Sequence, residues 1–70
     1  SALAALATEN NDERQLWHRH AFWTCRQVLE AYGVPEQVEA GDGSMSWYYR
    51  VDDRVLHFVF YDGMLVELWN

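Results

Sequence analysis

The feature that most constrains this sequence is a regular alternation of side chains from residue 44 to the end. Three segments, residues 44–51, 54–61 and 64–69, are rich in β-branched and aromatic residues and are bounded by turn-forming residues. A period of two is typical of strands that bury one face of a sheet. Only short turns separate the segments, so they predict a three-stranded antiparallel meander.

The turns decide which side chains face the core. Asp52-Asp53 suits a two-residue turn, whereas Asp62-Gly63 fits either a type I′ turn or a three-residue loop that includes Tyr61. A two-residue loop pairs Phe58 with Glu67, while the longer loop leaves one face wholly apolar, so we predict the longer loop. The predicted inner face consists of Met45, Trp47, Tyr49, Leu56, Phe58, Phe60, Met64, Val66 and Leu68.

The outer face of the predicted sheet is also apolar, although a solvated face is normally polar. It carries Ser46, Tyr48, Arg50, Val55, His57, Val59, Leu65, Glu67 and Trp69. Exposed apolar patches tend to mark interaction sites, and Tyr and Trp are enriched at binding hot spots. The predicted partner-binding residues are Tyr48, His57, Val59, Leu65, Glu67 and Trp69. In this register His57 lies opposite Glu67. Cover by the N-terminal segment or by a second copy of the chain is the alternative.

Residues 11–32 carry helical periodicity. Gly33 and Pro35, which follow them, are typical of the residues just after a helix C-terminus. Thr24 to Gln27 also has the spacing of a capping box, so we favour a break into residues 12–22 and 25–32 over one continuous helix. In a continuous helix Leu16, His20 and Trp23 form an exposed ridge, which is a second candidate contact surface. In a broken helix Trp23 turns inward and this ridge disappears.

These patterns predict an α+β fold, with one helix or two helices packed on one face of the sheet. Seventy residues make a single domain with a thin stability margin, and its eleven aromatic residues compensate through dense packing. Residues 11–70 form the predicted domain, and residues 1–10 are a linker, a tag remnant or a helical extension. A signal-peptide tail fits residues 1–7 less well, because residues 8–11 end the apolar pattern at once.

The charge balance excludes some partner classes. The net charge is −6, and five arginines with no lysine stand against eleven acidic residues. A nucleic-acid partner requires a basic surface, and an anionic membrane surface would repel this chain. No apolar run approaches the roughly 20 residues of a transmembrane helix. A protein partner or self-association remains, and a small-molecule ligand is not expected.

Histidine and cysteine residues do not form a reactive constellation in the sequence. His18 and His20 lie about 200° apart on a helix and cannot share one metal ion. The predicted pair of His57 and Glu67 has no neighbouring nucleophile. Cys25 lies on the apolar helix stripe, where a packed core thiol is the expected state.

Glu36, Glu39 and Asp42 gather in the connection that precedes the meander. They lack the alternate-ligand spacing of a calcium loop, so a solvated acidic loop is expected. No catalytic residue, metal site or cofactor is predicted, and the chain is not expected to be an enzyme.

The pattern from Thr24 onward resembles the SmpA/BamE-like outer-membrane assembly lipoprotein family. It consists of Thr24-x-x-Gln27-Val28, Tyr32-Gly33-Val34-Pro35, Gly43, Trp47-Tyr48-Tyr49, Leu56-His57-Phe58-Val59-Phe60 and Gly63. The β-lactamase inhibitor proteins resemble the same unit. The resemblance implies a non-catalytic domain of the bacterial cell envelope, periplasmic in location, that scaffolds or inhibits other proteins. The Gly-Met before the family's Thr is Phe22-Trp23 here, and Cys25 lies in the helix rather than at a lipid-attachment position.

Overall fold

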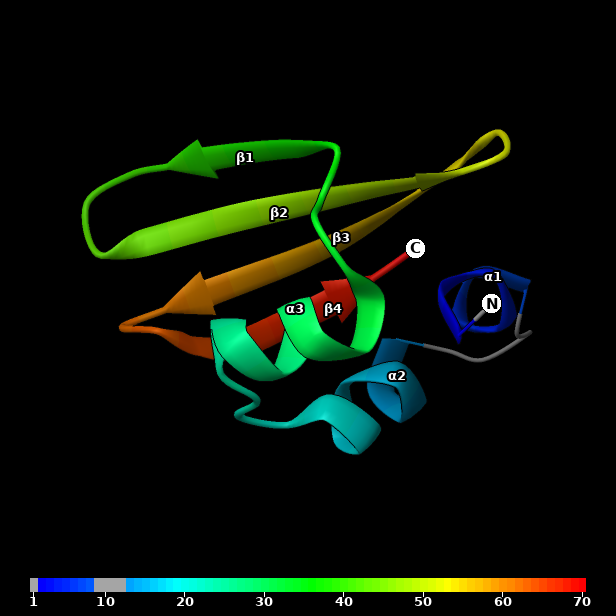
Figure 1. The fold of residues 1–70 in the computed structure, drawn as a ribbon. Coiled ribbons are helices and arrows are strands. Elements are labelled where there is room, and N and C mark those ends of the chain that lie inside the picture. Colours follow the sequence, from blue (N-terminus) through cyan, green and yellow to red (C-terminus); the bar gives the residue numbers. More distant parts are fainter. Residues whose placement is uncertain (1, 9–12) are drawn as a thin grey trace.

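The computed structural model describes residues 2–8 and 13–70 (Figure 1), with the backbone alone for residues 8 and 13–16. Within these residues three short helices precede four strands. Their bounds are α1 Ala2–Thr8, α2 Glu13–His20, α3 Cys25–Tyr32, β1 Gln37–Ala40, β2 Ser44–Val51, β3 Arg54–Tyr61 and β4 Met64–Trp69. The α+β class predicted from the sequence is confirmed, and the predicted number of strands is corrected below.

The sheet has four antiparallel strands in the order β1-β2-β3-β4, so each strand pairs with its neighbour in sequence. The prediction of three strands was wrong, because residues 37–40 form β1 rather than an acidic loop. A tight turn at Asp42-Gly43 folds β1 back onto β2, and the Gly41 amide donates to the Ser44 carbonyl at 2.9 Å. Gly43 has a φ of 76°, which favours glycine.

The central hairpin has the predicted register. The two-residue turn at Asp52-Asp53 joins Val51 to Arg54, and Trp47 lies opposite Phe58. The inward residues of this hairpin form a large part of the core. Trp47, Tyr49, Leu56, Phe58 and Phe60 are all buried.

The register of the last hairpin differs from the prediction. Asp62 and Gly63 have φ values of 57° and 82°, as in a type I′ turn, so the loop has two residues rather than three. Phe60 consequently pairs with Leu65, which is fully buried. A β-bulge then leaves Val66 without a partner on β3.

The bulge restores the predicted side for the end of β4. Beyond it, Phe58 pairs with Leu68, and Leu68 is buried as predicted. The predictions for Met64 and Val66 were wrong, since both side chains are exposed. One extra residue reverses which face the following side chains occupy. The bulge therefore allows both Leu65, set by the two-residue turn, and Leu68 to lie on the apolar inner face.

The helical region is broken, as the sequence favoured. α2 ends at His20, and Phe22 adopts a left-handed conformation with a φ of 62°. Thr24 then caps α3, because its Oγ1 accepts from the Gln27 amide at 3.2 Å and its own amide donates to Gln27 Oε1 at 2.8 Å. The last turn of α3 closes at Gly33, whose amide donates to the Leu29 carbonyl at 2.8 Å.

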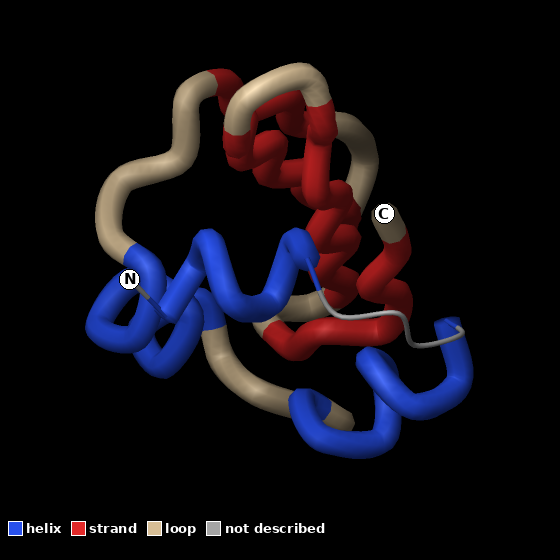
Figure 2. Tube along the Cα trace, turned by 90° about the vertical axis from the view of Figure 1, so that its right-hand side faces the viewer, coloured by secondary structure: helices blue, strands red, loops and turns tan. Residues whose placement is uncertain are grey.

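The helices occupy one side of the sheet and one of its edges. α1 and α3 lie on the same side of the strands in Figures 1 and 2, while α2 lies beside β4. Leu6 and Ala7 of α1 and Val28 of α3 complete the core. The Ala7 carbonyl accepts from Arg54 Nη1 at 2.8 Å and from Asn70 Nδ2 at 3.0 Å, and these bonds tie the end of α1 to the sheet.

The two edges of the sheet differ. The connection between α2 and α3 covers the edge of β4, since the Phe22 amide donates to the Leu65 carbonyl at 3.3 Å and the Leu65 amide donates to the Trp23 carbonyl at 2.7 Å. β1 forms the other edge, and in Figure 1 no described segment lies beyond it. All four residues of β1 are exposed.

Candidate protein-binding face

The sheet register brings three aromatic side chains together on the outer face. Tyr48 lies opposite His57, and His57 lies opposite Trp69. The ring centroids of Tyr48 and His57 are 4.9 Å apart at an interplanar angle of 86°, and those of His57 and Trp69 are 3.7 Å apart at 4°. These three residues, here called the aromatic row, form a continuous surface across β2, β3 and β4.

The aromatic row combines partial exposure with fixed geometry. Trp69 is 37% exposed, while Tyr48 and His57 are half-buried. Desolvation lowers the pKa of His57 below its ordinary value of 6.5, so its imidazole is neutral at neutral pH. A neutral imidazole stacked on an indole adds flat, weakly polar area to this face.

Valines surround the aromatic row, and the predicted ion pair beside it is not formed. Val59 is half-buried and lies opposite Glu67, which is exposed. The predicted pairing of His57 with Glu67 was wrong, because the two-residue turn and the bulge at Val66 each shift β4 by one residue and so set Glu67 opposite Val59. The carboxylate of Glu67 therefore lies at the margin of the apolar surface.

Leu65 does not belong to this face, although the sequence placed it there. Its side chain is fully buried in the core, because the type I′ turn pairs it with Phe60. That prediction was wrong.

The second predicted contact surface is not formed by the residues that the structure describes. His20 is 4% exposed, and its Nε2 is hydrogen-bonded to the Tyr32 hydroxyl. Trp23 is half-buried and stacks on Tyr32 with a centroid distance of 6.3 Å. The side chain of Leu16 lies outside the described residues. The break before Thr24 turns His20 and Trp23 inward.

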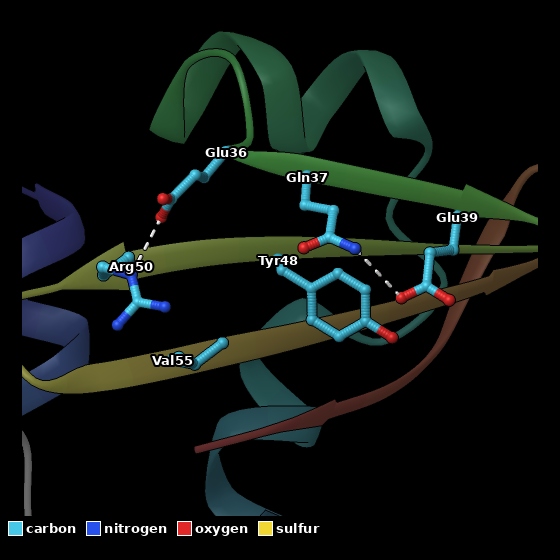
Figure 3. Close-up of a pocket in the computed structure, with 6 residues that line it drawn as sticks. All are labelled: Glu36, Gln37, Glu39, Tyr48, Arg50 and Val55. Carbon is cyan, nitrogen blue, oxygen red and sulfur yellow. Dashed lines mark hydrogen bonds and ion pairs between the residues drawn. The ribbon is translucent and has the colours of Figure 1, made fainter.

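A hollow lies on the outer face where β1 meets β2. Its volume is about 270 Å³, and its lining side chains are Glu36, Gln37, Glu39, Tyr48, Arg50 and Val55 (Figure 3). Arg50 Nε lies 3.3 Å from Glu36 Oε2, and Gln37 Nε2 donates to Glu39 Oε1 at 3.4 Å. Among the described residues no ion pair neutralises Glu39. Sequence reasoning missed this hollow because it placed Glu39 in a loop. The Asp42-Gly43 turn directly before the predicted strand 44–51 is the signal that could have indicated a strand on its other side.

Two features bear on reactivity. No three His, Cys, Asp or Glu side chains of the described residues are grouped so that they could hold a metal ion. Cys25 is half-buried, and burial raises the pKa of its thiol, which disfavours the reactive thiolate.

Comparisons with known proteins return no match, whether the chain is compared with protein-family models, with curated proteins or with solved structures. In the described part of the chain no helix is both long and apolar enough to span a bilayer.

Proposed function

We propose that this domain binds another protein through the aromatic row of Tyr48, His57 and Trp69. The observation that carries the proposal is the contiguous contact of three rings on the face of the sheet opposite α1 and α3. Tyrosine and tryptophan are the residues most often found at binding hot spots. A domain this small gains stability by burying such rings, so leaving Trp69 more than one-third exposed indicates a role outside the core.

The geometry of the row favours binding further. The rings already contact one another, so little side-chain entropy is lost when a partner covers them. Glu67 and the acidic hollow lie around the rings and supply the polar rim that protein interfaces generally have. The function proposed here is non-catalytic.

The resemblance to the SmpA/BamE-like family adds a cellular setting to this proposal. In that setting the domain acts in the bacterial cell envelope, where it scaffolds or inhibits a partner. The aromatic row is the surface through which it would do so.

Affinity capture with matched variants tests the proposal. The double variant Tyr48→Ala/Trp69→Ala removes the row, while Leu29→Ala/Met64→Ala removes exposed apolar side chains elsewhere. We expect one or more proteins to be retained by the wild type and the control but lost from the row variant. Circular dichroism melts check that both variants fold. Identical sets of captured proteins for all three chains would refute the proposal.

Sedimentation across a concentration series separates a foreign partner from a second copy. A monomer at the highest concentration supports a foreign partner. A dimer that dissociates in Trp69→Ala assigns the row to self-association, and the domain is then a structural unit of a homodimer.

A further inference from the structure

The open edge of β1 offers backbone groups to a further strand. The Gly41 amide donates to the Ser44 carbonyl, so Gly41 and Ser44 form a hydrogen-bonded pair. Hydrogen-bonded pairs alternate along an antiparallel ladder, and Glu39 and Gln37 therefore also bond to β2. The intervening residues Val38 and Ala40 direct their N–H and C=O groups away from β2. Such groups are a template for strand addition.

The two sides of this edge differ in chemistry. On the outer side stand Gln37, Glu39 and the hollow that contains the Tyr48 ring, and Figure 3 shows their side chains on one side of the sheet. On the inner side stand Val38, which is 50% exposed and lies opposite Trp47, and Ala40, which lies opposite Met45. A strand added to β1 would thus meet carboxylate and aromatic groups on one side and aliphatic side chains on the other.

We propose that β1 binds an extended segment of a partner protein in which basic and apolar residues alternate. The backbone of this segment pairs with Val38 and Ala40. Its apolar side chains lie beside Val38 and Ala40, and a lysine or arginine enters the hollow between Glu39 and the Tyr48 ring. This inference rests on the protein-binding function proposed above, and it names the partner segment.

Charge selects the basic segment. Glu36 is already paired with Arg50, whereas no described cation neutralises Glu39. A cation in the hollow would pair with the Glu39 carboxylate and also contact the face of the Tyr48 ring. The net charge of −6 attracts a basic segment from a distance.

The same charge disfavours a second copy on this edge. The antiparallel register that pairs Val38 with Ala40 of another copy sets Glu39 opposite Glu39, and like charges directly opposite are destabilising. The register that pairs Val38 with Val38 sets Glu39 opposite the neutral Gln37 and supplies no cation to it. β1 itself contains no lysine or arginine that could pair with Glu39 of another copy.

The test uses ¹⁵N-labelled protein and a short end-blocked peptide of alternating lysine and valine. We expect saturable shifts and slowed hydrogen exchange at the Val38 and Ala40 amides. Two control peptides should produce neither effect at the same concentration. One replaces lysine with glutamate, and the other is N-methylated at its valines, which removes the backbone donors on the edge that would face β1.

Protein variants test the same contacts. Val38→Pro removes one outward N–H without removing a bond to β2 and should abolish binding, while Val38→Ala keeps the N–H and should retain most of it. Glu39→Gln should weaken binding about three- to five-fold, the effect of losing one exposed ion pair. If Val38→Pro unfolds, the N-methylated peptide still tests the backbone pairing.

Two results would overturn the strand-addition inference. One is the absence of saturable shifts at Val38 and Ala40. The other is a dimer of the wild type that Val38→Pro dissociates, because a second copy would then occupy the edge. Shifts confined to the aromatic row would reject the edge and leave the proposed function intact. Loss of partner capture by the row variant is measured separately, so the two proposals can fail independently.

Discussion

At the scale of single residues, Phe22 shows how the break between α2 and α3 is made. Its φ of 62° is rare for a bulky residue, and the ring is 64% exposed with an edge contact to Trp17 at 5.5 Å. The conformation persists because the Phe22 amide donates to the Leu65 carbonyl of β4 and the Trp23 amide donates to the His20 carbonyl. The sequence places a strained residue where glycine would fit without strain.

Replacing Phe22 with glycine and with alanine measures this strain. A left-handed conformation costs an L-residue about 1–2 kcal/mol, whereas glycine adopts it freely. Both variants lose the same ring, so we expect Phe22→Gly to be more stable than Phe22→Ala by about 1 kcal/mol in urea unfolding. Equal stabilities, or a more stable alanine variant, would show that Phe22 is not strained.

Tyr49 makes the stability of the domain depend on pH, and the direction of this dependence follows from the burial of its side chain. Burial raises the pKa of Tyr49 to about 12, and its hydroxyl donates to the Gly33 carbonyl at 2.7 Å. The ordinary value is 10.0, so between pH 10 and 12 the unfolded chain loses this proton while the folded chain keeps it. The contribution of Tyr49 to stability is complete below pH 10 and falls as the pH rises toward 12.

Comparison of wild type with Tyr49→Phe isolates this contribution. We expect Tyr49→Phe to lose about 1 kcal/mol at neutral pH through its missing hydrogen bond, and to show a shallower fall in unfolding free energy between pH 10 and 12. The other tyrosines and Cys25 are common to both chains. Parallel pH profiles would contradict the assignment.

At the scale of elements, α3 depends on its cap, because a helix of eight residues is too short to be stable alone. The capping box of Thr24 and Gln27 satisfies amides at its start, and α3 delivers Val28 and Tyr32 to the core. The cap also fixes the point at which the chain leaves the edge of β4.

Removing the cap should therefore weaken the whole domain. We expect Thr24→Ala to lower the unfolding free energy by about 1 kcal/mol, and Thr24→Ser to lose much less because it keeps the hydroxyl. Thermal melts followed by circular dichroism measure both variants. A loss as large in Thr24→Ser as in Thr24→Ala would assign the effect to the methyl group rather than to the cap.

At the scale of the whole molecule, the two faces of the sheet have separate roles. The inner face and helices form one core around Phe58, Phe60 and Leu56, while the outer face keeps Tyr48 and Trp69 partly exposed. With about 60% of the unfolded surface buried in a chain of this size, the core has little margin to lose.

Alanine substitutions on the two faces should thus have opposite consequences. Phe58→Ala should cost about 3–5 kcal/mol, which approaches the entire stability of a small domain. Tyr48→Ala should leave folding largely intact and weaken partner binding. Urea unfolding measures the first effect, and affinity capture measures the second. A chain that unfolds on Tyr48→Ala but tolerates Phe58→Ala would have its faces reversed.

Local pattern alone determined much of this fold. The three segments of residues 44–69 are strands because their side chains alternate, and β2 pairs with β3 in the predicted register because Asp52-Asp53 permits a two-residue turn. The capping box at Thr24 located the helix break, and the outward positions of Tyr48 and His57 followed from the alternation. Each of these features depends on residues close together in the chain.

Only the tertiary structure decided the remaining features. β1 has few strand-forming residues and exists because β2 offers it a ladder, and the hollow on the outer face exists because β1 lies there. The inward orientation of Leu65 depends on the two-residue turn at Asp62-Gly63, and the bulge at Val66 then turns Leu68 inward and Trp69 outward, since one inserted residue reverses the faces of a strand. No local pattern shows where a bulge or a weak edge strand forms, because the stabilising contacts come from the neighbouring strand.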